Sequence, residues 1–237
     1  MAQASELAQA IASDGYAIWP DFVHGEQLRV LKANAGVLLA GPHGRAYPKS
    51  TRAWDLHLHA GPYVEVLIDE RMASLVDTLL GHGHLLSDFS LNQVNPHQPT
   101  DDWHIDYPYN EMPRLVSGSL LGLQCVLALD RFRPDNGATH LLPGTHTTPT
   151  KPAPQYESAV LFEAPAGSLL IMAAATWHRS GLNTSDRPRT AMLMSFVERW
   201  IKPMSAPTDG LAEPAPVRLR ALLGLEAAAE TINGVPL

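Results

Sequence analysis

The chain has 237 residues, of which 45% are hydrophobic, and this is enough apolar material for a folded core rather than a disordered segment. Its formal net charge of −7 and the lack of any run of Lys or Arg exclude the basic surface that follows nucleic-acid phosphates, so we expect no nucleic-acid partner. The single cysteine, Cys125, cannot form an internal disulfide and lies in an apolar run, which predicts a buried thiol.

The first third of the chain is predicted to be rich in helices. Ser5 is expected to cap a helix that ends at Gly15, and residues 16–19 follow as a short strand. Apolar residues then recur at helical spacing over 28–39 and 64–79. Between these two segments, residues 53–59 alternate between apolar and polar side chains, which predicts a strand. Its polar face would carry Asp55, His57 and His59, three candidates for substrate contact.

From Leu85 onward the apolar runs are short, rich in β-forming residues and separated by turn signals. This spacing favours a β-sandwich or barrel. The runs cover residues 85–95, 119–129, 159–164, 167–173 and 189–200. In the tail, residues 219–230 are predicted to form a helix that packs on the body or on a second copy of the chain, which would give a homodimer.

We expect one domain over residues 1–237, with a helix-rich part at 1–84, a β-rich core at 85–200 and a C-terminal extension at 201–237. No stretch has the roughly 18 consecutive apolar residues that span a bilayer. The first residues also lack the basic and apolar regions of a secretion signal. These features predict a cytoplasmic protein without membrane contact.

The stretch DDWHIDYPY, residues 101–109, contains a histidine and an aspartate one residue apart. In extended chain such residues point the same way, so His104 and Asp106 could share one metal ion while Ile105 faces the core. A His-x-Asp pair is expected about 0.6 times by chance in this composition, so it carries no weight alone. His178 is the best third ligand, because it follows an apolar strand that could pair opposite His104. Two imidazoles and one carboxylate are the ligand set of non-haem Fe(II) oxygenases.

Three segments together resemble the phytanoyl-CoA dioxygenase family of Fe(II)/2-oxoglutarate-dependent oxygenases. They are WHIDYP, which contains the histidine and aspartate above, DNGATHLLPGTH at 135–146, and HRSGLNTSDRPR beginning at His178. The resemblance extends over roughly residues 15–200. It implies a mainly β fold with flanking helices, namely a double-stranded β-helix (a cupin-like jelly roll) with helices packed outside. This chain departs from some relatives, which have a tryptophan where residues 123–126 read LQCV.

The resemblance also implies roles for particular residues. His104, Asp106 and His178 would bind Fe(II) and carry the catalysis with O₂. Arg189 would hold the far carboxylate of the cosubstrate 2-oxoglutarate, because a guanidinium forms a bidentate pair with a carboxylate and keeps its charge. Arg187 is the competing candidate for this role. Further contacts to the cosubstrate are expected from Ser180 and from three polar residues on inner strands, Thr139, Asn92 and Ser90.

The expected activity is hydroxylation of an unactivated C–H bond of a small-molecule metabolite, with release of succinate and CO₂. Desaturation or oxidative cyclisation with the same cofactors stays open, as does a non-catalytic jelly-roll binding protein. Asp106 argues against halogenation, because halogenating relatives have a small residue in its place. The acidic composition gives no support for a CoA ester as substrate. Four aromatic residues beside the motifs could form pocket walls or pack in the core: Tyr107, Tyr109, Trp177 and Trp200.

Overall fold

A seven-stranded antiparallel sheet forms the centre of the molecule in this computed structural model. The structure describes residues 2–59, 61–114, 118–147, 150, 158–226, 231–232 and 235–236. Its strand order is β1-β8-β5-β10-β4-β3-β2. The strands are β1 (Tyr16–Trp19), β2 (Arg45–Ala46), β3 (Ser50–Ala53), β4 (Leu85–Val94), β5 (Gly122–Ala128), β8 (Leu169–Ala173) and β10 (Arg189–Val197). A smaller sheet has the order β7-β6-β9, with β6 (Thr139–Leu141), β7 (Val160–Leu161) and β9 (His178–Ser180). A separate strand pair joins β11 (Thr231–Ile232) and β12 (Val235–Pro236).

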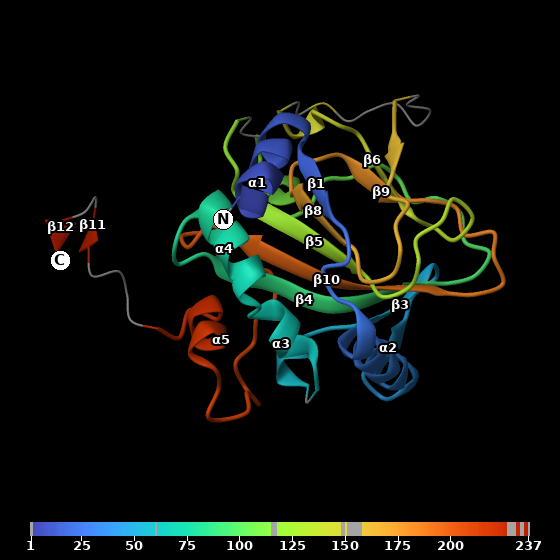
Figure 1. Cartoon of the computed structure of the whole chain (residues 1–237), viewed down its shortest axis with the longest axis horizontal. Helices are drawn as coiled ribbons and strands as arrows, with labels where there is room; N and C mark the ends of the chain where they lie inside the picture. The colour runs from blue at the N-terminus through green and yellow to red at the C-terminus, as the bar shows by residue number, and fades with distance from the viewer. Residues whose placement is uncertain are drawn as a thin grey trace.

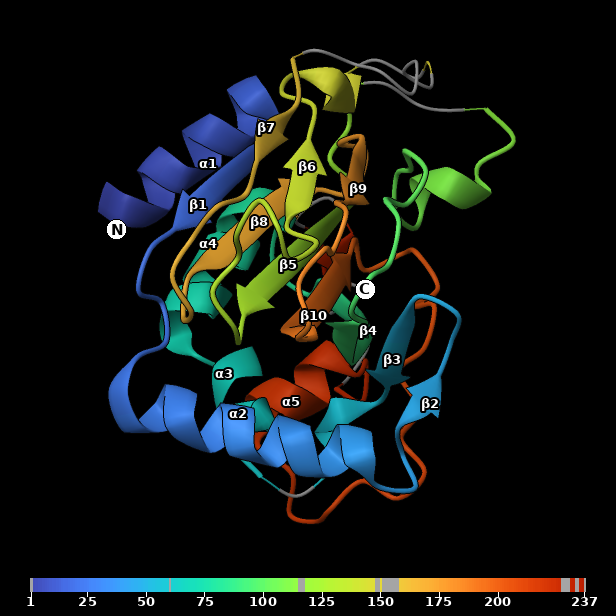
Figure 2. The same cartoon turned by 90° about the vertical axis from the view of Figure 1, so that its right-hand side faces the viewer.

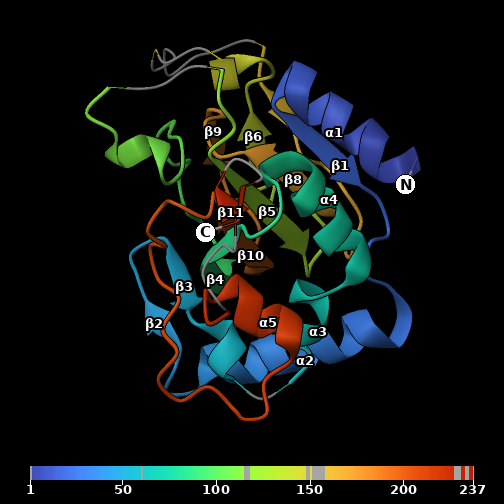
Figure 3. The same ribbon diagram turned by 90° about the vertical axis from the view of Figure 1, so that its left-hand side faces the viewer.

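Helices cover one face of the large sheet, and the small sheet covers the other (Figures 1 and 2). Figure 3 shows α1, α3 and α4 on the side of the sheet away from β6 and β9. The helices are α1 (Ala2–Asp14), α2 (Gly25–Ala40), α3 (Tyr63–Leu67), α4 (Glu70–Leu80) and α5 (Val217–Leu222), with short 3₁₀ turns η1 (Leu56–Leu58), η2 (Tyr109–Glu111) and η3 (Thr145–Thr147). Two facing sheets with external helices form the predicted jelly-roll core.

The alternation of side chains along the central strands explains this layering. In β5, Leu123, Cys125 and Leu127 pack into the large cluster shared with the helices. Val126 and Ala128 point the other way, into a second cluster between the two sheets. Because both faces are covered, every residue of β5 is buried, as the continuous apolar run predicted. Cys125 is buried, as predicted, and burial raises the pKa of its thiol to about 12.

The strand predicted over residues 53–59 is wrong. Strand β3 ends at Ala53, and Asp55 has a left-handed backbone (φ 57°) that starts the turn η1. His57 is buried, with Nε2 2.8 Å from the Pro207 carbonyl oxygen, and Asp55 accepts a 3.1 Å hydrogen bond from Ser205. These two side chains therefore anchor the C-terminal extension instead of forming a polar strand face.

Two other local predictions also need correction. Ser5 does not cap α1, because the helix already begins at Ala2. The tail helix α5 covers only Val217–Leu222, and the end of the predicted 219–230 helix lies outside the described residues. None of the helices in the described part of the chain has the length and hydrophobicity needed to cross a bilayer. The single-domain organisation and the homodimer stay predictions.

Candidate functional site

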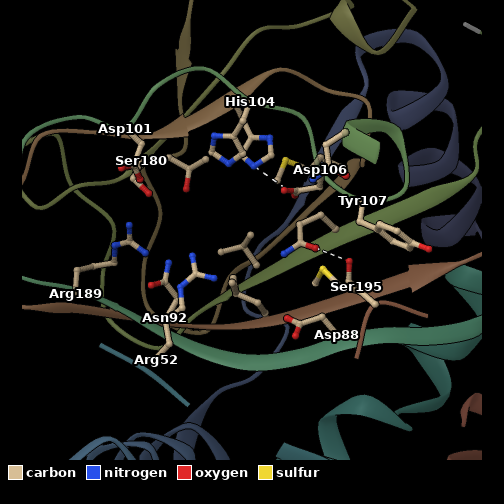
Figure 4. Close-up of a pocket in the computed structure, with 18 residues that line it drawn as sticks. Arg52, Asp88, Asn92, Asp101, His104, Asp106, Tyr107, Ser180, Arg189 and Ser195 are labelled. Carbon is tan, nitrogen blue, oxygen red and sulfur yellow. Dashed lines mark hydrogen bonds and ion pairs between the residues drawn. The ribbon is translucent and has the colours of Figure 1, made fainter. Parts of the chain in front are cut away.

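A cavity of about 180 Å³ opens between the two sheets (Figure 4). It is lined by seven of the residues that the sequence singled out as ligands or cosubstrate contacts: His104, Asp106, His178, Arg189, Ser180, Thr139 and Asn92. These residues come from β4, β6, β9, β10 and the segment before η2. Residues as far apart in the sequence as Asn92 and Arg189, 97 positions, therefore line the same cavity. Ser90, the other cosubstrate candidate, instead donates a 2.7 Å hydrogen bond to Asp88.

Backbone pairing brings the three predicted metal ligands together. His104 and His178 form an isolated antiparallel bridge in which each amide donates a 3.0 Å hydrogen bond to the other's carbonyl. The amide of Asp106 donates to the Ala174 carbonyl at 2.8 Å, while Trp103 and Ile105 are buried on the opposite side. Ligand atoms of the three side chains all lie within 4.8 Å of one another. The structure thus places His178 opposite His104, as the strand pairing predicted.

Each imidazole is oriented by a backbone carbonyl near it. Nδ1 of His104 lies 3.0 Å from the Asp102 carbonyl oxygen, and Nδ1 of His178 lies 2.9 Å from that of Thr176. A proton on Nδ1 leaves the lone pair of Nε2 free, which is how protein-bound metals are usually held by histidine. Burial lowers the pKa of His178, although the nearby Asp106 charge opposes this shift. The neutral, metal-binding form of the ring is therefore favoured.

This donor set fits Fe(II). Nε2 of His178 and Oδ2 of Asp106 are 3.4 Å apart, and the two imidazole centroids are 4.3 Å apart. Two nitrogens and one carboxylate oxygen on one side of an ion leave positions open for a chelating cosubstrate and O₂. No other cluster of three or more His, Cys, Asp or Glu with this proximity occurs among the described residues.

Arg189 lies in the same cavity and is 2% exposed. Its guanidinium donates to the Gly137 carbonyl and lies 4.1 Å from the centroid of the Phe132 ring, whereas Nε is buried without a hydrogen-bond partner in the described structure. Burial lowers the pKa of Arg189 to about 10, opposed by Asp130 and Asp101, so the group stays protonated at neutral pH. A buried cation with an unused donor is suited to binding a carboxylate.

The loop before β10 determines which of the two arginines enters the cavity. The buried Asn183 side chain donates to the carbonyls of Asn95 (2.9 Å) and Arg187 (3.2 Å). Its Oδ1 accepts from the amide and the hydroxyl of Ser185 at 3.0 and 2.7 Å. The side chain of Arg187 is exposed, and the adjacent Asp186 contacts His97 at 3.1 Å. Arg189, at the start of the strand, points inward.

A family model described as phytanoyl-CoA dioxygenase (PhyH) matches residues 11–191. The chain belongs to the phytanoyl-CoA dioxygenase family. The match includes the His104–Asp106 segment, His178 and Arg189, so the family assignment and the cavity involve the same residues.

Curated relatives of this family member include an uncharacterized protein of Mycobacterium tuberculosis, 32% identical over 160 residues, with 64% of this chain and 58% of the relative covered. The dioxygenase trt7 of Aspergillus terreus is 28% identical over 126 residues, with 52% of this chain and 44% of the relative covered. The chain thus spans about half the length of these relatives.

Solved structures with the same fold include SnoN, an epimerase of nogalamycin biosynthesis, in complex with Fe³⁺, α-ketoglutarate and nogalamycin RO. It has a TM-score of 0.71 and 19% identity, with 100% of this chain and 96% of SnoN covered. The carbocyclase SnoK from the same biosynthesis has a TM-score of 0.65 and 16% identity, with 81% and 83% covered. At these identities the likeness establishes the shared jelly-roll fold.

The cavity of this phytanoyl-CoA dioxygenase family member also contains polar residues that sequence reasoning missed: Arg52, Asp88, Asp101, Gln124 and Ser195. Arg52 lies in β3 opposite Asn92 of β4. A strand predicted to start at residue 53 left it out. The polar residues at 88, 90 and 92 alternate along β4 with buried Phe89 and Leu91, so the period-two pattern could have identified the inner face.

The aromatic residues near the motifs have different positions. Tyr107 lines the cavity, and its hydroxyl donates to the Lys202 carbonyl. Tyr109 and Trp177 are buried in a core cluster, whereas Trp200 is 70% exposed. Of these four, only Tyr107 is a wall residue of the cavity.

Proposed function

We propose that this chain is an Fe(II)- and 2-oxoglutarate-dependent oxygenase that hydroxylates an unactivated C–H bond of a small-molecule substrate. The observation that carries the proposal is the convergence of His104, Asp106 and His178 in the same cavity as the buried cation of Arg189. The buried cation of Arg189, which has no ion-pair partner among the described residues, favours a site that binds an anionic cosubstrate, because an unpaired buried charge is costly.

In this proposal the protein residues have distinct roles. His104, Asp106 and His178 hold the metal, and the carbonyls of Asp102 and Thr176 fix both imidazole rings. The chemistry that Fe(II) and 2-oxoglutarate supply is the activation of O₂, with release of succinate and CO₂. With the Asp106 carboxylate present as a third ligand, we propose oxygen transfer rather than halogenation.

Two arginines would bind the cosubstrate. Arg189 would pair with its far carboxylate, and Arg52, which has no hydrogen bond or ion pair among the described residues, would add a second positive charge at the same end of the cavity. Thr139 and Ser180 face each other across β6 and β9 and would offer hydroxyl groups. The apolar inner residues Val126 and Leu193 limit water beside this site.

The same cofactors could also serve desaturation or ring closure, and two neighbours of the same fold are named epimerase and carbocyclase. Hydroxylation is the outcome we propose, and product analysis by mass spectrometry would separate it from the others. The substrate class is expected to be a small metabolite rather than a CoA ester.

The decisive experiment is anaerobic addition of Fe(II) and 2-oxoglutarate to the purified chain. We expect a weak visible charge-transfer band that is lost in Asp106→Ala and in His178→Ala. The control His82→Ala changes an exposed histidine that does not line the cavity, so the band should persist. Iron bound by the unmutated chain without a band would refute the oxygenase proposal and favour a non-catalytic binding protein.

A further inference from the structure

Asp88 is a buried acid on the floor of the cavity, and the proposed chemistry gives it no role. Asp88 is only 6% exposed to solvent. Oδ2 accepts a 2.7 Å hydrogen bond from the Ser90 hydroxyl, while Oδ1 is buried with no hydrogen-bond partner in the part of the chain that the structure describes. An unpartnered carboxylate oxygen costs free energy in the free protein, so its presence in a pocket suggests a partner that arrives with a ligand.

Asp88 belongs to a row of polar side chains across three neighbouring strands. Ser195 of β10 lies opposite both Asp88 of β4 and Gln124 of β5. The Ser195 hydroxyl donates to Oε1 of Gln124 at 2.8 Å, which fixes the orientation of the amide. All three residues line the cavity, so this row forms one polar surface.

This row is displaced along the strands from the arginine end of the cavity. Arg189 lies opposite Val94, six residues along β4 from Asp88, which at a rise of about 3.4 Å per residue is on the order of 20 Å of strand. Figure 4 shows Arg189 on one side of the cavity and Asp88 with Ser195 on the other, with His104 above the cavity and Asp106 above Ser195. An anionic cosubstrate at the arginine end therefore leaves the space beside Asp88 free.

The charges around Asp88 favour a cationic ligand. The positive charge of Arg52 lowers the pKa of Asp88, although the two do not form an ion pair, and the negative charges of Asp55 and Asp106 raise it. If Arg52 pairs with the cosubstrate dianion, its charge no longer compensates that of Asp88. The neutral polar groups of Gln124 and Ser195 add hydrogen-bonding capacity without positive charge.

We propose that Asp88 is a specificity-determining residue, and that the primary substrate carries a protonated amine that pairs with its carboxylate. The assignment rests on the proposed function, because it takes the arginine end of the cavity to be the 2-oxoglutarate site. It names a substrate class, small basic metabolites, and excludes primary substrates whose group at this position is a carboxylate or phosphate.

The test compares three probes with the same carbon skeleton: butylammonium, butanol and butyrate. Their dissociation constants are measured by ligand-observed NMR at pH 8, under argon, with the chain loaded with Fe(II) and 2-oxoglutarate. We expect butylammonium to bind about tenfold more tightly than butanol, because a charge-assisted hydrogen bond is worth about this factor or more, and butyrate to bind most weakly. In Asp88→Asn, the ratio of butylammonium to butanol affinity should fall to about one.

Asp101→Asn is the matched control, since Asp101 also lines the cavity but is already paired with Lys49 at 3.0 Å. The preference for butylammonium should survive this change. Butylammonium binding no better than butanol to the unmutated chain, including no binding of either, overturns the assignment without need of a variant. A preference that survives in Asp88→Asn overturns it as well.

The charge-transfer band recorded in the same samples separates the two proposals. A chain that shows the band but no preference for the amine contradicts the substrate class alone. A chain without the band contradicts the proposed function. It also contradicts the assignment of the space beside Asp88 to the primary substrate, because that assignment rests on the proposed function.

Discussion

Replacing Asp88 with asparagine should stabilise the metal-free chain at pH 8. Burial raises the pKa of Asp88 from 3.8 to about 6, with Asp55 and Asp106 adding to the rise and Ser90 and Arg52 opposing it. At about 1.4 kcal/mol per pKa unit, the difference between these two values corresponds to ~3 kcal/mol. Asparagine keeps an oxygen that can accept from Ser90 and replaces the unpartnered Oδ1 with an uncharged NH₂ group.

The effect should depend on pH in one direction. Because the folded-state pKa lies above the unfolded-state value, the ionised carboxylate destabilises the fold at pH values above about 6. This cost decreases as the pH falls through 6 and disappears below 3.8. The variant should therefore exceed the unmutated chain by up to ~3 kcal/mol in free energy of unfolding at pH 8, and the two should converge near pH 4.

Urea unfolding followed by tryptophan fluorescence at pH 8, 7, 6 and 5, with a chelator present, would measure this difference. Asp186→Asn is the control, since that carboxylate is exposed and its replacement should change the free energy of unfolding by less than about 0.5 kcal/mol. The reasoning about a buried, unpartnered charge is refuted if Asp88→Asn is less stable at pH 8, or if its difference from the unmutated chain is the same at every pH.

Two further changes test other parts of the molecule. Arg189→Leu should raise the 2-oxoglutarate concentration needed to form the charge-transfer band about a hundredfold, because it removes charge-assisted hydrogen bonds. Arg187 is exposed, so Arg187→Leu should have little effect on that concentration. A larger effect of Arg187→Leu would identify Arg187 as the residue that binds the cosubstrate carboxylate. Gly167→Ala should destabilise the fold by about 2 kcal/mol or more in urea unfolding, because the backbone has φ +91° and a Cβ would lie 1.9 Å from the Val23 carbonyl oxygen. An unchanged free energy of unfolding in Gly167→Ala would contradict the close approach of Gly167 to the Val23 carbonyl oxygen.

The sequence was most informative where periodicity and local chain direction decide the structure. The apolar runs became β4, β5, β8 and β10, and strand β1 has the predicted bounds Tyr16–Trp19. The triad could be proposed because His104 and Asp106 are two residues apart and His178 follows a strand. Their proximity required one antiparallel pairing, which the structure contains.

Local patterns failed where distant contacts decide the conformation. The alternation over residues 53–59 is genuine, but His57 is held by the Pro207 carbonyl, 150 residues away in sequence. Arg52 was missed because the predicted strand began at Ala53, whereas β3 ends there. Asp88 could be placed on one face of a strand, but only the packing of the second sheet determines that this face lines a cavity instead of meeting solvent.

The metal ligands and the polar row of Asp88, Gln124 and Ser195 are supported by different parts of the backbone. His104 and Asp106 lie on a segment that is hydrogen-bonded to His178 at the start of β9 and to Ala174 after β8, whereas the polar row projects from the central strands of the large sheet. Side chains of the row can therefore be exchanged without altering the hydrogen bonds that position the ligands. This separation makes the cavity a promising starting point for directed evolution, in which substrate preference is varied by mutating the sheet while iron binding is retained.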